Sequence, residues 1–563
     1  MPADTPLAAA VEARLAAWEA EQVADRLWER DGTLWAGSGA APEALAAWLG
    51  WLELPSSMQA RAPELERLAR EVRDDGYTRA AVLGMGGSSL APELFSRLFG
   101  DPLGAPPPGS AGLELRVLDS THPDAVRGFR EWAESARTLF CVSSKSGTTT
   151  EPNAFQAVMS AHAPALDFVA ITDPGTPHAD LARAQGFRAI LDGDPAVGGR
   201  YSALSAFGLF PAALHGVDLG RLLERAQEMA DACRRPAATN PGLRLGALLG
   251  EAARQGRDKL TLLTSPRLAS FADWAEQLVA ESTGKAGQGI VPVVAEPLGE
   301  AAAYGADRAF VVLTLTQESD PGLGALIAEL RSAGHPVEHF ALNDAYDLGG
   351  EFIRWEVGTA AAGIVLGINP FDQPNVQASK DATTALLETY RQTGSLPAPA
   401  PWVSEPGIAA YLDPASLGEE PVSVDGALRA IFDTAQPGDY VALQAFIPAD
   451  QPVVERLERM RGRIRDRRGL ASTLGFGPRF LHSTGQLHKG GPATGMFLQL
   501  TADPQRDLPI PGWPESFGTL IAAQAMGDLS ALQAAGRRVL RIHLGDPASG
   551  LERVDAMITA ALG

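Results

Sequence analysis

The feature that most constrains the fold is a repeated alternation of short apolar runs with segments of helical pattern. From residue 78 the runs RAAVLGMG, LRVLDS, LFCVSS, FVAITD and FRAILDG follow one another, with helical segments between them. A second set, KLTLLTS, IVPVVAEP, AFVVLTL and VEHFALND, begins after residue 255. Buried parallel strands joined by crossover helices have this pattern. The sequence therefore predicts an α/β fold with two doubly wound parallel-sheet domains.

The same patterns divide the 563 residues into five parts. Apolar residues at helical spacing predict a helical segment over 1–75, and the two alternations predict domains over 76–215 and 256–394. Helical spacing returns over 216–255, which we expect to connect the two domains. The Pro-rich stretch SLPAPAPW then marks the start of a C-terminal α/β extension over 395–563.

Composition limits where such a chain acts and what it binds. No run approaches the roughly 18 apolar residues that a membrane span needs, and the N-terminal stretch lacks the basic start and cleavage site of a signal peptide. Two cysteines cannot form a disulfide framework, so we expect a cytoplasmic protein. A net charge of −21 argues against nonspecific binding to nucleic acid or to an anionic membrane.

Lysine is rare in this chain, and its placement is uneven. Only five of the 47 basic residues are lysines, and four of these lie in glycine- or hydroxyl-rich stretches: Lys145, Lys285, Lys380 and Lys489. An ammonium is a compact point charge, whereas a guanidinium is a planar fork, so the two groups bind ligands differently. Codon bias alone would also make lysine rare, but the placement favours a functional role for Lys145 and Lys380.

Two polar loops follow strands of the first predicted domain. GMGGSS (84–89) comes after the run AAVL, and SSKSGTTTEP (143–152) comes after LFCV. Amide groups at a helix N-terminus and hydroxyl groups can surround a phosphate, and ligands of open α/β sheets bind at the carboxyl ends of the strands. A tight turn or a helix-capping cluster would look similar. Because two such loops occur in one domain, the sequence favours a phosphate site.

Two further motifs carry groups suited to proton transfer beside a carbonyl. In VGGRYS (197–202) the glycines allow a close approach and Arg200 could stabilise a developing oxyanion, although a surface arginine after a tight turn is the alternative. In the helix FADWAEQLVAESTGK, Asp273, Gln277 and Glu281 share one face. Glu281 could be a partly buried general base, while a solvated acidic face would give the same pattern.

The last motif, FDQPNVQASK (371–380), pairs Gln373 with Lys380 across a helix start. With GMGGSS, SKSGTT, VGGRYS and ESTGK it completes a set that stands in the order, and at about the spacing, found in glucose-6-phosphate isomerases. The chain resembles this family, which is built from two sugar-isomerase domains, over about 76–385. Its helical start and long tail are similar to the isomerase half of bacterial transaldolase/glucose-6-phosphate isomerase fusions.

The resemblance implies reversible isomerisation of glucose 6-phosphate and fructose 6-phosphate through a cis-enediol, in glycolysis and gluconeogenesis. Glu281 would move a proton between C2 and C1, Arg200 would stabilise the intermediate, and Lys380 would help ring opening. The residues implied to bind the substrate are Gly87, Ser88, Ser144, Lys145, Ser146, Thr149, Gln277 and Gln373. No metal or cofactor is expected. The implied partners are the sugar phosphate and a second copy of the chain, in a homodimer with the site near the subunit interface.

One departure from the family concerns the ring-opening group. The family carries a histidine in a segment beginning GEPGT, whereas the comparable segment here, AEPLGEAAAYGADR (295–308), has none. The polar stretch GPRFLHSTGQLHKGGP (477–492) contains two histidines. We expect His488, and with less support His482, to replace the missing residue from the partner subunit. One alternative is that His122, which follows a strand end, opens the ring. The other is that the stretch 477–492 has a purely structural role.

Three other functions fit parts of the pattern. A dual phosphoglucose/phosphomannose isomerase would keep the same fold and residues. A non-catalytic sugar-phosphate-binding regulator would need the phosphate loops but neither Glu281 nor Arg200. A separate activity of the C-terminal extension is the third, although no independent catalytic set is evident there.

Overall fold

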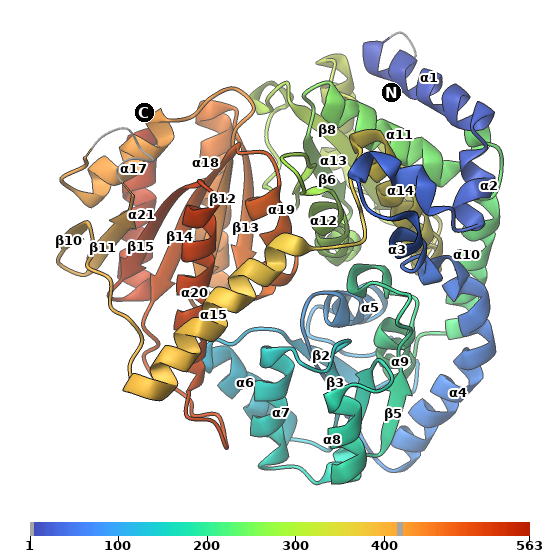
Figure 1. The fold of residues 1–563 in the computed structure, drawn as a ribbon, viewed down its shortest axis with the longest axis horizontal. Coiled ribbons are helices and arrows are strands. Elements are labelled where there is room, and N and C mark those ends of the chain that lie inside the picture. The colour runs from blue at the N-terminus through green and yellow to red at the C-terminus, as the bar shows by residue number, and fades with distance from the viewer. Residues whose placement is uncertain (1–4, 108, 414–419) are drawn as a thin grey trace.

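The computed structural model describes residues 5–107, 109–413 and 420–563. Residues 1–4 of the predicted helical segment and residues 414–419 of the predicted extension lie outside the described residues. The described chain forms three β-sheets with helices packed around them (Figure 1). The predicted α/β class with parallel sheets is confirmed.

Helices at the N-terminus cover one side of the molecule, the right-hand edge of Figure 1. They are α1 (Pro6–Ala20), α2 (Val23–Trp28), η1 (Gly32–Ser38), α3 (Pro42–Ala46), η2 (Gly50–Glu53) and α4 (Leu54–Asp74). The first of them packs on α11 (Pro241–Arg254), while α4 packs on α9 (Ala206–His215) and α10 (Leu219–Ala232). Trp18, Trp35 and Trp51, which belong to α1, η1 and η2, are buried. The N-terminal helices are thus part of the core rather than an appendage.

The first sheet is five-stranded and parallel, in the order β2-β1-β3-β4-β5. Its strands are β1 (Arg79–Gly84), β2 (Glu114–Leu118), β3 (Thr138–Ser143), β4 (Phe168–Thr172) and β5 (Ala189–Asp192). Its helices are α5 (Leu90–Phe99), α6 (Pro123–Glu134), α7 (Thr150–Ser160) and α8 (Pro177–Gln185). Every residue of β3 and β4 is buried, as expected for strands covered on both faces.

The second sheet is four-stranded and parallel, in the order β7-β6-β8-β9. Its strands are β6 (Lys259–Thr264), β7 (Val291–Val293), β8 (Arg308–Leu315) and β9 (Val337–Leu342). The helices that pack with it are α12 (Ala269–Thr283), α13 (Pro321–Ser332) and α14 (Leu348–Leu366). A buried helix, α14, packs against α10, α11 and α12.

The third sheet, on the left of Figure 1, has the order β10-β11-β15-β14-β12-β13. Strands β12 to β15 are parallel, and the hairpin of β10 and β11 adds an antiparallel edge. The strands are β10 (Val403–Glu405), β11 (Ile408–Leu412), β12 (Tyr440–Phe446), β13 (Ala471–Phe476), β14 (Gly495–Ala502) and β15 (Arg538–Leu544). The helices are α15 (Pro374–Thr393), α17 (Val424–Asp433), α18 (Gln451–Arg468), α19 (Gly485–Gly490), α20 (Phe517–Ala534) and α21 (Pro547–Leu562).

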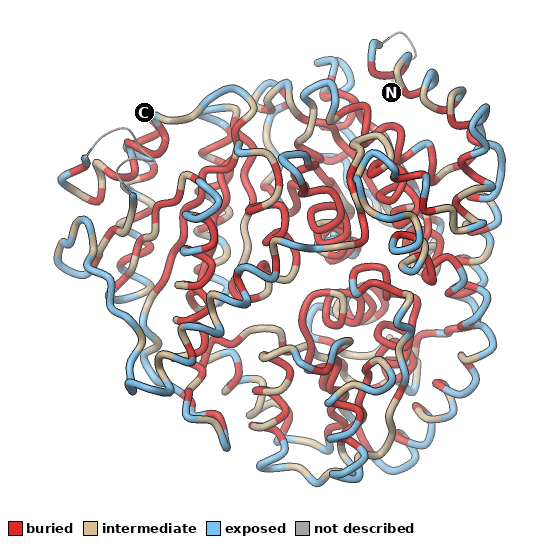
Figure 2. Tube along the Cα trace, in the orientation of Figure 1, coloured by how far each residue is buried: buried red, intermediate tan, exposed pale blue. Residues whose placement is uncertain are grey.

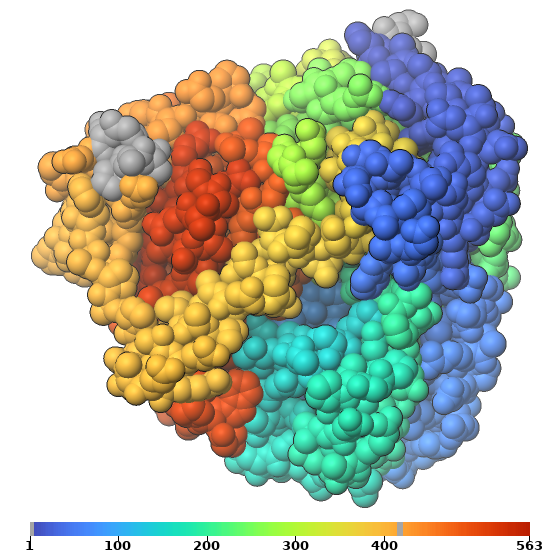
Figure 3. All heavy atoms as spheres, viewed as in Figure 1, coloured from blue at the N-terminus to red at the C-terminus, as the bar shows by residue number. Residues whose placement is uncertain are grey.

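Two large apolar clusters lie within the described residues, and Figure 2 shows the buried runs of chain that contain them. One continuous apolar cluster joins the N-terminal helices with the first and second sheets. The third sheet has its own cluster. A smaller cluster joins α20 to the first sheet through Phe517 and Leu520, which pack with Phe155. In Figure 3 the yellow helix α15 crosses the face of the molecule and lies over α20.

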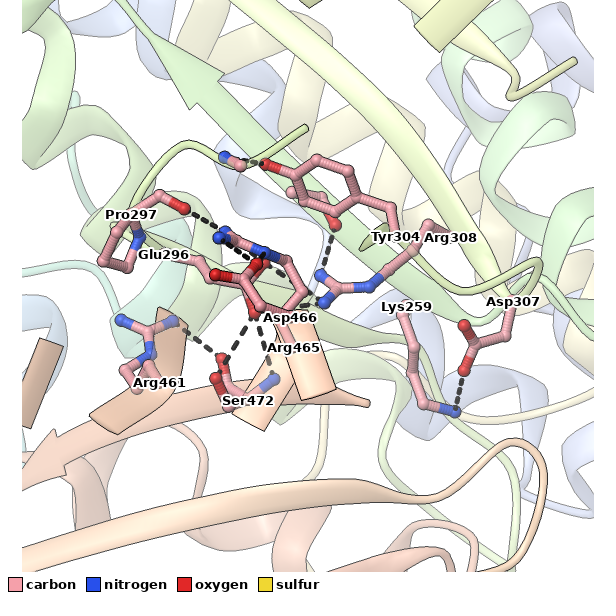
Figure 4. A network of polar contacts seen from close by, with 12 residues as sticks. Lys259, Glu296, Pro297, Tyr304, Asp307, Arg308, Arg461, Arg465, Asp466 and Ser472 are labelled. Atoms are coloured by element: carbon pink, nitrogen blue, oxygen red, sulfur yellow. Dashed lines mark hydrogen bonds and ion pairs between the residues drawn. The ribbon is translucent and has the colours of Figure 1, made fainter. Parts of the chain in front are cut away.

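A buried polar network joins the second sheet to the C-terminal region (Figure 4). The guanidinium of Arg308 binds both carboxylate oxygens of Glu296 at 3.0 and 3.1 Å. The hydroxyl of Ser472 on β13 donates to Glu296 Oε1 at 3.3 Å, and Arg465 on α18 lies 3.9 Å from Oε2. Glu296 belongs to the segment 295–308, where the resemblance led us to look for a histidine. Here that segment binds the C-terminal region instead.

Candidate active site

The two predicted phosphate loops lie at the same edge of the first sheet. Strand β1 pairs with β3, so GMGGSS and SSKSGTTT begin side by side, and α7 begins at the end of the second loop. A Cβ atom on Gly87 would lie 2.0 Å from the carbonyl oxygen of Gly199, so only glycine fits there. Gly86 has φ of 54°, and its added Cβ would lie 2.9 Å from the carbonyl oxygen of His482. The GMGGSS loop therefore contacts both the VGGRYS loop and the C-terminal region.

Arg200 is almost completely buried and all three of its guanidinium nitrogens have partners. Its Nε donates to Ser282 Oγ at 2.7 Å, and its Nη2 donates to the carbonyl of Pro370 at 2.7 Å. Its Nη1 donates to Gln373 Oε1 at 3.0 Å and lies 3.1 Å from Glu281 Oε1. The structure thus brings together Arg200, Glu281 and Gln373 from three separate motifs.

Glu281 lies near the end of α12, and only 8% of its surface is exposed. Gln277, one turn earlier, donates from Nε2 to Glu281 Oε2 at 3.1 Å. The same nitrogen lies 2.8 Å from the carbonyl oxygen of His482. Both oxygens of the carboxylate therefore have partners, and Gln277 joins this cluster to the C-terminal region.

A cavity of about 240 Å3 opens beside the second phosphate loop. Its polar lining includes Thr149 and Glu151 from the start of α7, Lys380 from α15, and His482 and Gln524 from the C-terminal region. An ammonium, three neighbouring threonine hydroxyls and a carboxylate–imidazole pair are suited to an anionic, hydroxylated ligand. Glu281 itself does not line this cavity and is connected to it through Gln277 and His482.

His482 ends the 3-10 helix η10 (Arg479–His482). Its Nε2 lies 3.0 Å from Glu151 Oε1. Burial would raise the pKa of Glu151, but the charge and hydrogen bond of His482 outweigh it, and the pKa lies below its usual value. Glu151 is therefore an ionised acceptor, and the imidazole nitrogen facing it carries a proton.

His488 lies in a different environment. Its ring packs between Phe480 and Phe497, with ring centroids 5.9 and 5.0 Å away. Its Nδ1 is 3.2 Å from the Gln444 amide nitrogen, and burial lowers its pKa well below the usual value. The side chain lies inside the core of the C-terminal region and does not line the cavity. The predicted polar loop is mostly buried and contains η10 and the helix α19.

The other candidate histidine, His122, is the N-cap of α6, where its Nδ1 accepts from the Asp124 amide at 3.3 Å. Burial lowers the pKa of His122. This residue has a capping role in the structure and does not line the cavity.

The remaining predicted phosphate ligands lie on the two loops, with different surroundings. Lys145 binds Asp173 Oδ2 at 2.5 Å and the carbonyl of Asp194 at 2.7 Å, so its ammonium is engaged by the loops after β4 and β5. Ser144 is buried, and its hydroxyl has no hydrogen-bond partner among the described residues. Ser146 is exposed and its hydroxyl lies 3.0 Å from that of Thr148. Ser88 is nearly buried in η3.

Several site residues escaped the sequence analysis. Glu151 directly follows the threonine run and was within the quoted motif, so its position was a usable signal. Ser282 and Lys285 lie in ESTGK; the ammonium of Lys285 donates to the carbonyl of Asn369 at 2.6 Å. Burial lowers the pKa of Lys285 to about 7. Gln524 lies in an apolar helix far along the chain, where no local pattern marks it.

The described ranges contain neither a cluster of metal ligands nor a membrane-spanning helix. Within residues 5–107, 109–413 and 420–563, no three histidine, cysteine or acidic side chains converge as metal ligands would. In the same ranges, the helices are too short or too polar to pass through a bilayer.

Two curated relatives resemble the chain along much of its length. A glucose-6-phosphate isomerase from Rubrobacter xylanophilus is 30% identical over 423 residues, which are 67% of this chain and 95% of that protein. A glucose-6-phosphate isomerase from Synechococcus sp. (strain JA-3-3Ab) is 31% identical over 370 residues, which are 56% of this chain and 67% of that protein. No protein-family model matches the chain.

A solved structure supports the fold independently. The crystal structure of a glucose-6-phosphate isomerase from Chlamydia trachomatis aligns with a TM-score of 0.53 at 19% identity. The alignment covers 68% of this chain and 86% of that one. At this identity the likeness concerns the arrangement of sheets and helices.

Proposed function

The chain belongs to the glucose-6-phosphate isomerase family, and we propose that Glu281 is the base with which it interconverts glucose 6-phosphate and fructose 6-phosphate. The enzyme is an aldose–ketose isomerase of glycolysis and gluconeogenesis. The observation that supports Glu281 is its buried pairing with Arg200, 3.1 Å away, at the end of a helix. A buried carboxylate can remove a proton next to a carbonyl, and a fixed positive charge beside it can stabilise the oxyanion that forms.

In the proposed step, Glu281 takes the proton from C2 of the open-chain aldose. The C2–H electron pair forms the C1–C2 double bond, and the carbonyl pair moves to O1. The resulting cis-enediolate is stabilised by Arg200, whose guanidinium is fixed before the substrate arrives. Glu281 then returns the proton to C1 while the O2 proton moves to O1, which leaves the ketose. This sequence of steps uses no metal or redox cofactor.

We place the substrate phosphate at the N-terminal end of α7, between the two loops. The unpaired hydroxyl of Ser144 supports this position, as do the hydroxyls of Ser146 and Thr149 and the close approach of the chain at Gly87. The positive end of the helix adds a favourable field. Lys145 lies in the same loop and completes the proposed set with Ser88. Holding the phosphate orients the reacting carbons from a distance.

We propose that His482, and not His488, opens the sugar ring. His482 lines the cavity together with Lys380, whereas His488 is enclosed by aromatic rings. Glu151 accepts from Nε2 of His482, so in the imidazolium form Nδ1 is the nitrogen available to donate a proton to the ring oxygen. Lys380 and Gln373 would position the sugar hydroxyls beside it.

Two substrates separate the proton transfer from the ring opening. Fructose 6-phosphate is cyclic, whereas 5-deoxyfructose 6-phosphate stays open because it lacks the hydroxyl that closes the ring. Glu281→Gln should abolish turnover of both. His482→Ala should lower kcat on the cyclic substrate by about 10² while turnover of the open substrate stays near the parent value. His488→Ala should leave the ratio of the two rates unchanged. Equal losses on both substrates for His482→Ala would contradict its assignment.

We also propose that the enzyme is a cytoplasmic homodimer. The resemblance to the family supports the dimer, and the two buried, unpaired cysteines fit a reducing compartment. Light scattering of the purified chain should give twice its mass of 59.1 kDa. The mass of a single chain at working concentration would contradict the proposed dimer.

A further inference from the structure

The cavity beside His482 is closed by a helix that the catalytic motifs do not include. Helix α20 belongs to the third sheet, yet Leu520 and Gln524 line the cavity together with Glu151. Gln524 is buried, with 3% of its surface exposed. A buried amide that lacks hydrogen-bond partners costs free energy. The hydrogen-bond partners of Gln524 therefore indicate which groups it holds in place.

Gln524 stands in the middle of a chain of hydrogen bonds. Its Nε2 donates to Glu151 Oε1 at 2.7 Å, and the Thr121 hydroxyl donates to its Oε1 at 2.7 Å. Glu151 Oε1 in turn lies 3.0 Å from His482 Nε2. Thr121, Gln524 and Glu151 are all buried, and the chain of hydrogen bonds runs from the end of β2 to the cavity.

The direction of these bonds fixes the protonation state at the far end. An amide oxygen accepts only, so the hydroxyl of Thr121 must donate to Gln524 and the NH2 group must face Glu151. The carboxylate then accepts from both Gln524 and His482 on one oxygen. Because this oxygen can only accept, Nε2 of His482 keeps its proton, and Nδ1 is the nitrogen left to gain and release one.

We infer that Gln524 is a positioning residue for ring opening: it fixes the carboxylate of Glu151, which orients the His482 imidazole toward the sugar. Thr121 sets the orientation of the Gln524 amide. This inference rests on the proposed role of His482. It gives the C-terminal region a defined task in the reaction, since both His482 and the residue that controls its partner come from that region.

The test compares Gln524→Leu with Gln499→Leu as a matched control. Gln499 is also a buried glutamine of the C-terminal region, but it contacts Asp528 and not Glu151. Gln524→Leu should lower kcat on fructose 6-phosphate about tenfold, the effect of one hydrogen bond to a charged group. Its KM and its turnover of 5-deoxyfructose 6-phosphate should stay near the parent values. Gln499→Leu should not change the ratio of the two rates.

The pH profile gives a second readout that a purely structural role would not move. Without the Gln524 donor, the charge of Glu151 is less neutralised and holds the His482 proton more tightly. The limb of the kcat profile that disappears in His482→Ala should therefore shift to higher pH in Gln524→Leu. Thr121→Val, which leaves Glu151 and Gln524 in place, should shift it less, in the same direction.

The outcomes separate this inference from the proposed function. If His482→Ala slows only the cyclic substrate while Gln524→Leu and Thr121→Val leave both the rate ratio and the pH limb unchanged, the positioning role is wrong and the ring-opening role of His482 stands. If His482→Ala itself leaves the rate ratio unchanged, both assignments are overturned. A lower ratio and a shifted limb in Gln524→Leu, with neither in Gln499→Leu, establish the positioning role.

Discussion

At the scale of single residues, the proposed site depends on a guanidinium whose donors are all committed. Arg200 binds Ser282, Gln373 and the carbonyls of Pro370 and Asp372, in addition to Glu281. Its position is therefore set by the protein before any substrate binds, which is what electrostatic stabilisation of a transition state requires. A lysine has one charged nitrogen and cannot make this set of contacts.

Arg200→Lys should therefore keep the positive charge but lose most of the activity. We expect kcat on 5-deoxyfructose 6-phosphate to fall by about 10² or more, with a smaller change in KM, because the fixed charge of the guanidinium acts on the enediolate rather than on the bound sugar. Steady-state kinetics on the open substrate measures this directly. A variant that retains half of the parent kcat would show that charge alone is enough.

Lys285 gives a prediction about stability and pH. Burial, with the nearby charge of Arg200, lowers its pKa to about 7 in the folded protein, whereas in the unfolded chain it stays near its usual value. Between about pH 7 and pH 10 the unfolded chain therefore binds more protons, so the free energy of unfolding rises with pH in that window. Denaturant titrations of Lys285→Met should lack this rise. Parallel pH curves for parent and variant would contradict it.

At the scale of elements, α19 packs against both α12, which carries Glu281, and α15, which carries Lys380. Gln486 donates to the carbonyl of Gly284, at the end of α12, and to Asn375 Oδ1, near the start of α15. It also accepts from the backbone amide of Asn375 at 2.8 Å. Gly284 allows this contact, since a Cβ there would lie 2.3 Å from Leu487 Cα.

Gly284→Ala should force α19 away from α12. We expect a loss of about 1–3 kcal/mol in the free energy of unfolding, as for other overpacked sites, together with reduced isomerase activity. Gly324→Ala in α13 is the control, because nothing lies within 4 Å of its added Cβ and alanine favours helix there by roughly 0.5–1 kcal/mol. We expect the free energy of unfolding to fall in Gly284→Ala and to rise in Gly324→Ala. Equal changes in the two variants would show that the packing of α19 on α12 does not depend on Gly284.

The same region shows how far sequence reasoning reaches. Strand, glycine-rich loop and helix follow one another locally, so the loops at Gly87 and Ser144 could be placed at one sheet edge without a structure. His482 and His488 are six positions apart in one polar stretch, and only tertiary packing decides that the first meets Glu151 and the second meets Phe497. A helix as short as α19 has little stability of its own, so its pattern carries no signal.

At the scale of the whole molecule, the third sheet is attached to the second by buried charges. Glu296 is enclosed with Arg308, Arg465 and Ser472, and both side chains of the Glu296–Arg308 pair are essentially buried. Residue order alone could not predict this junction, because its members lie far apart in the chain. Removal of one partner of such a pair destabilises the folded protein, because the other charge is then buried without a counter-charge.

Glu296→Gln should therefore weaken the attachment of the whole C-terminal region. We expect the free energy of unfolding to fall by about 3 kcal/mol or more, because Arg308 and Arg465 lose their counter-charge. Glu71→Gln removes a half-exposed partner of Arg67 and should cost less than about 1 kcal/mol. Denaturant unfolding of the three proteins measures the difference, and equal losses would show that the network adds no stability.

The central claim is that one carboxylate, Glu281, carries a proton between two carbons of the sugar. Conversion of fructose 6-phosphate in deuterium oxide tests it most directly, because a base exchanges its proton with solvent while a hydride shift does not. We expect deuterium at C2 of part of the glucose 6-phosphate formed by the parent enzyme, and no conversion by Glu281→Gln. Product without solvent deuterium, or turnover by Glu281→Gln at the parent rate, would contradict it.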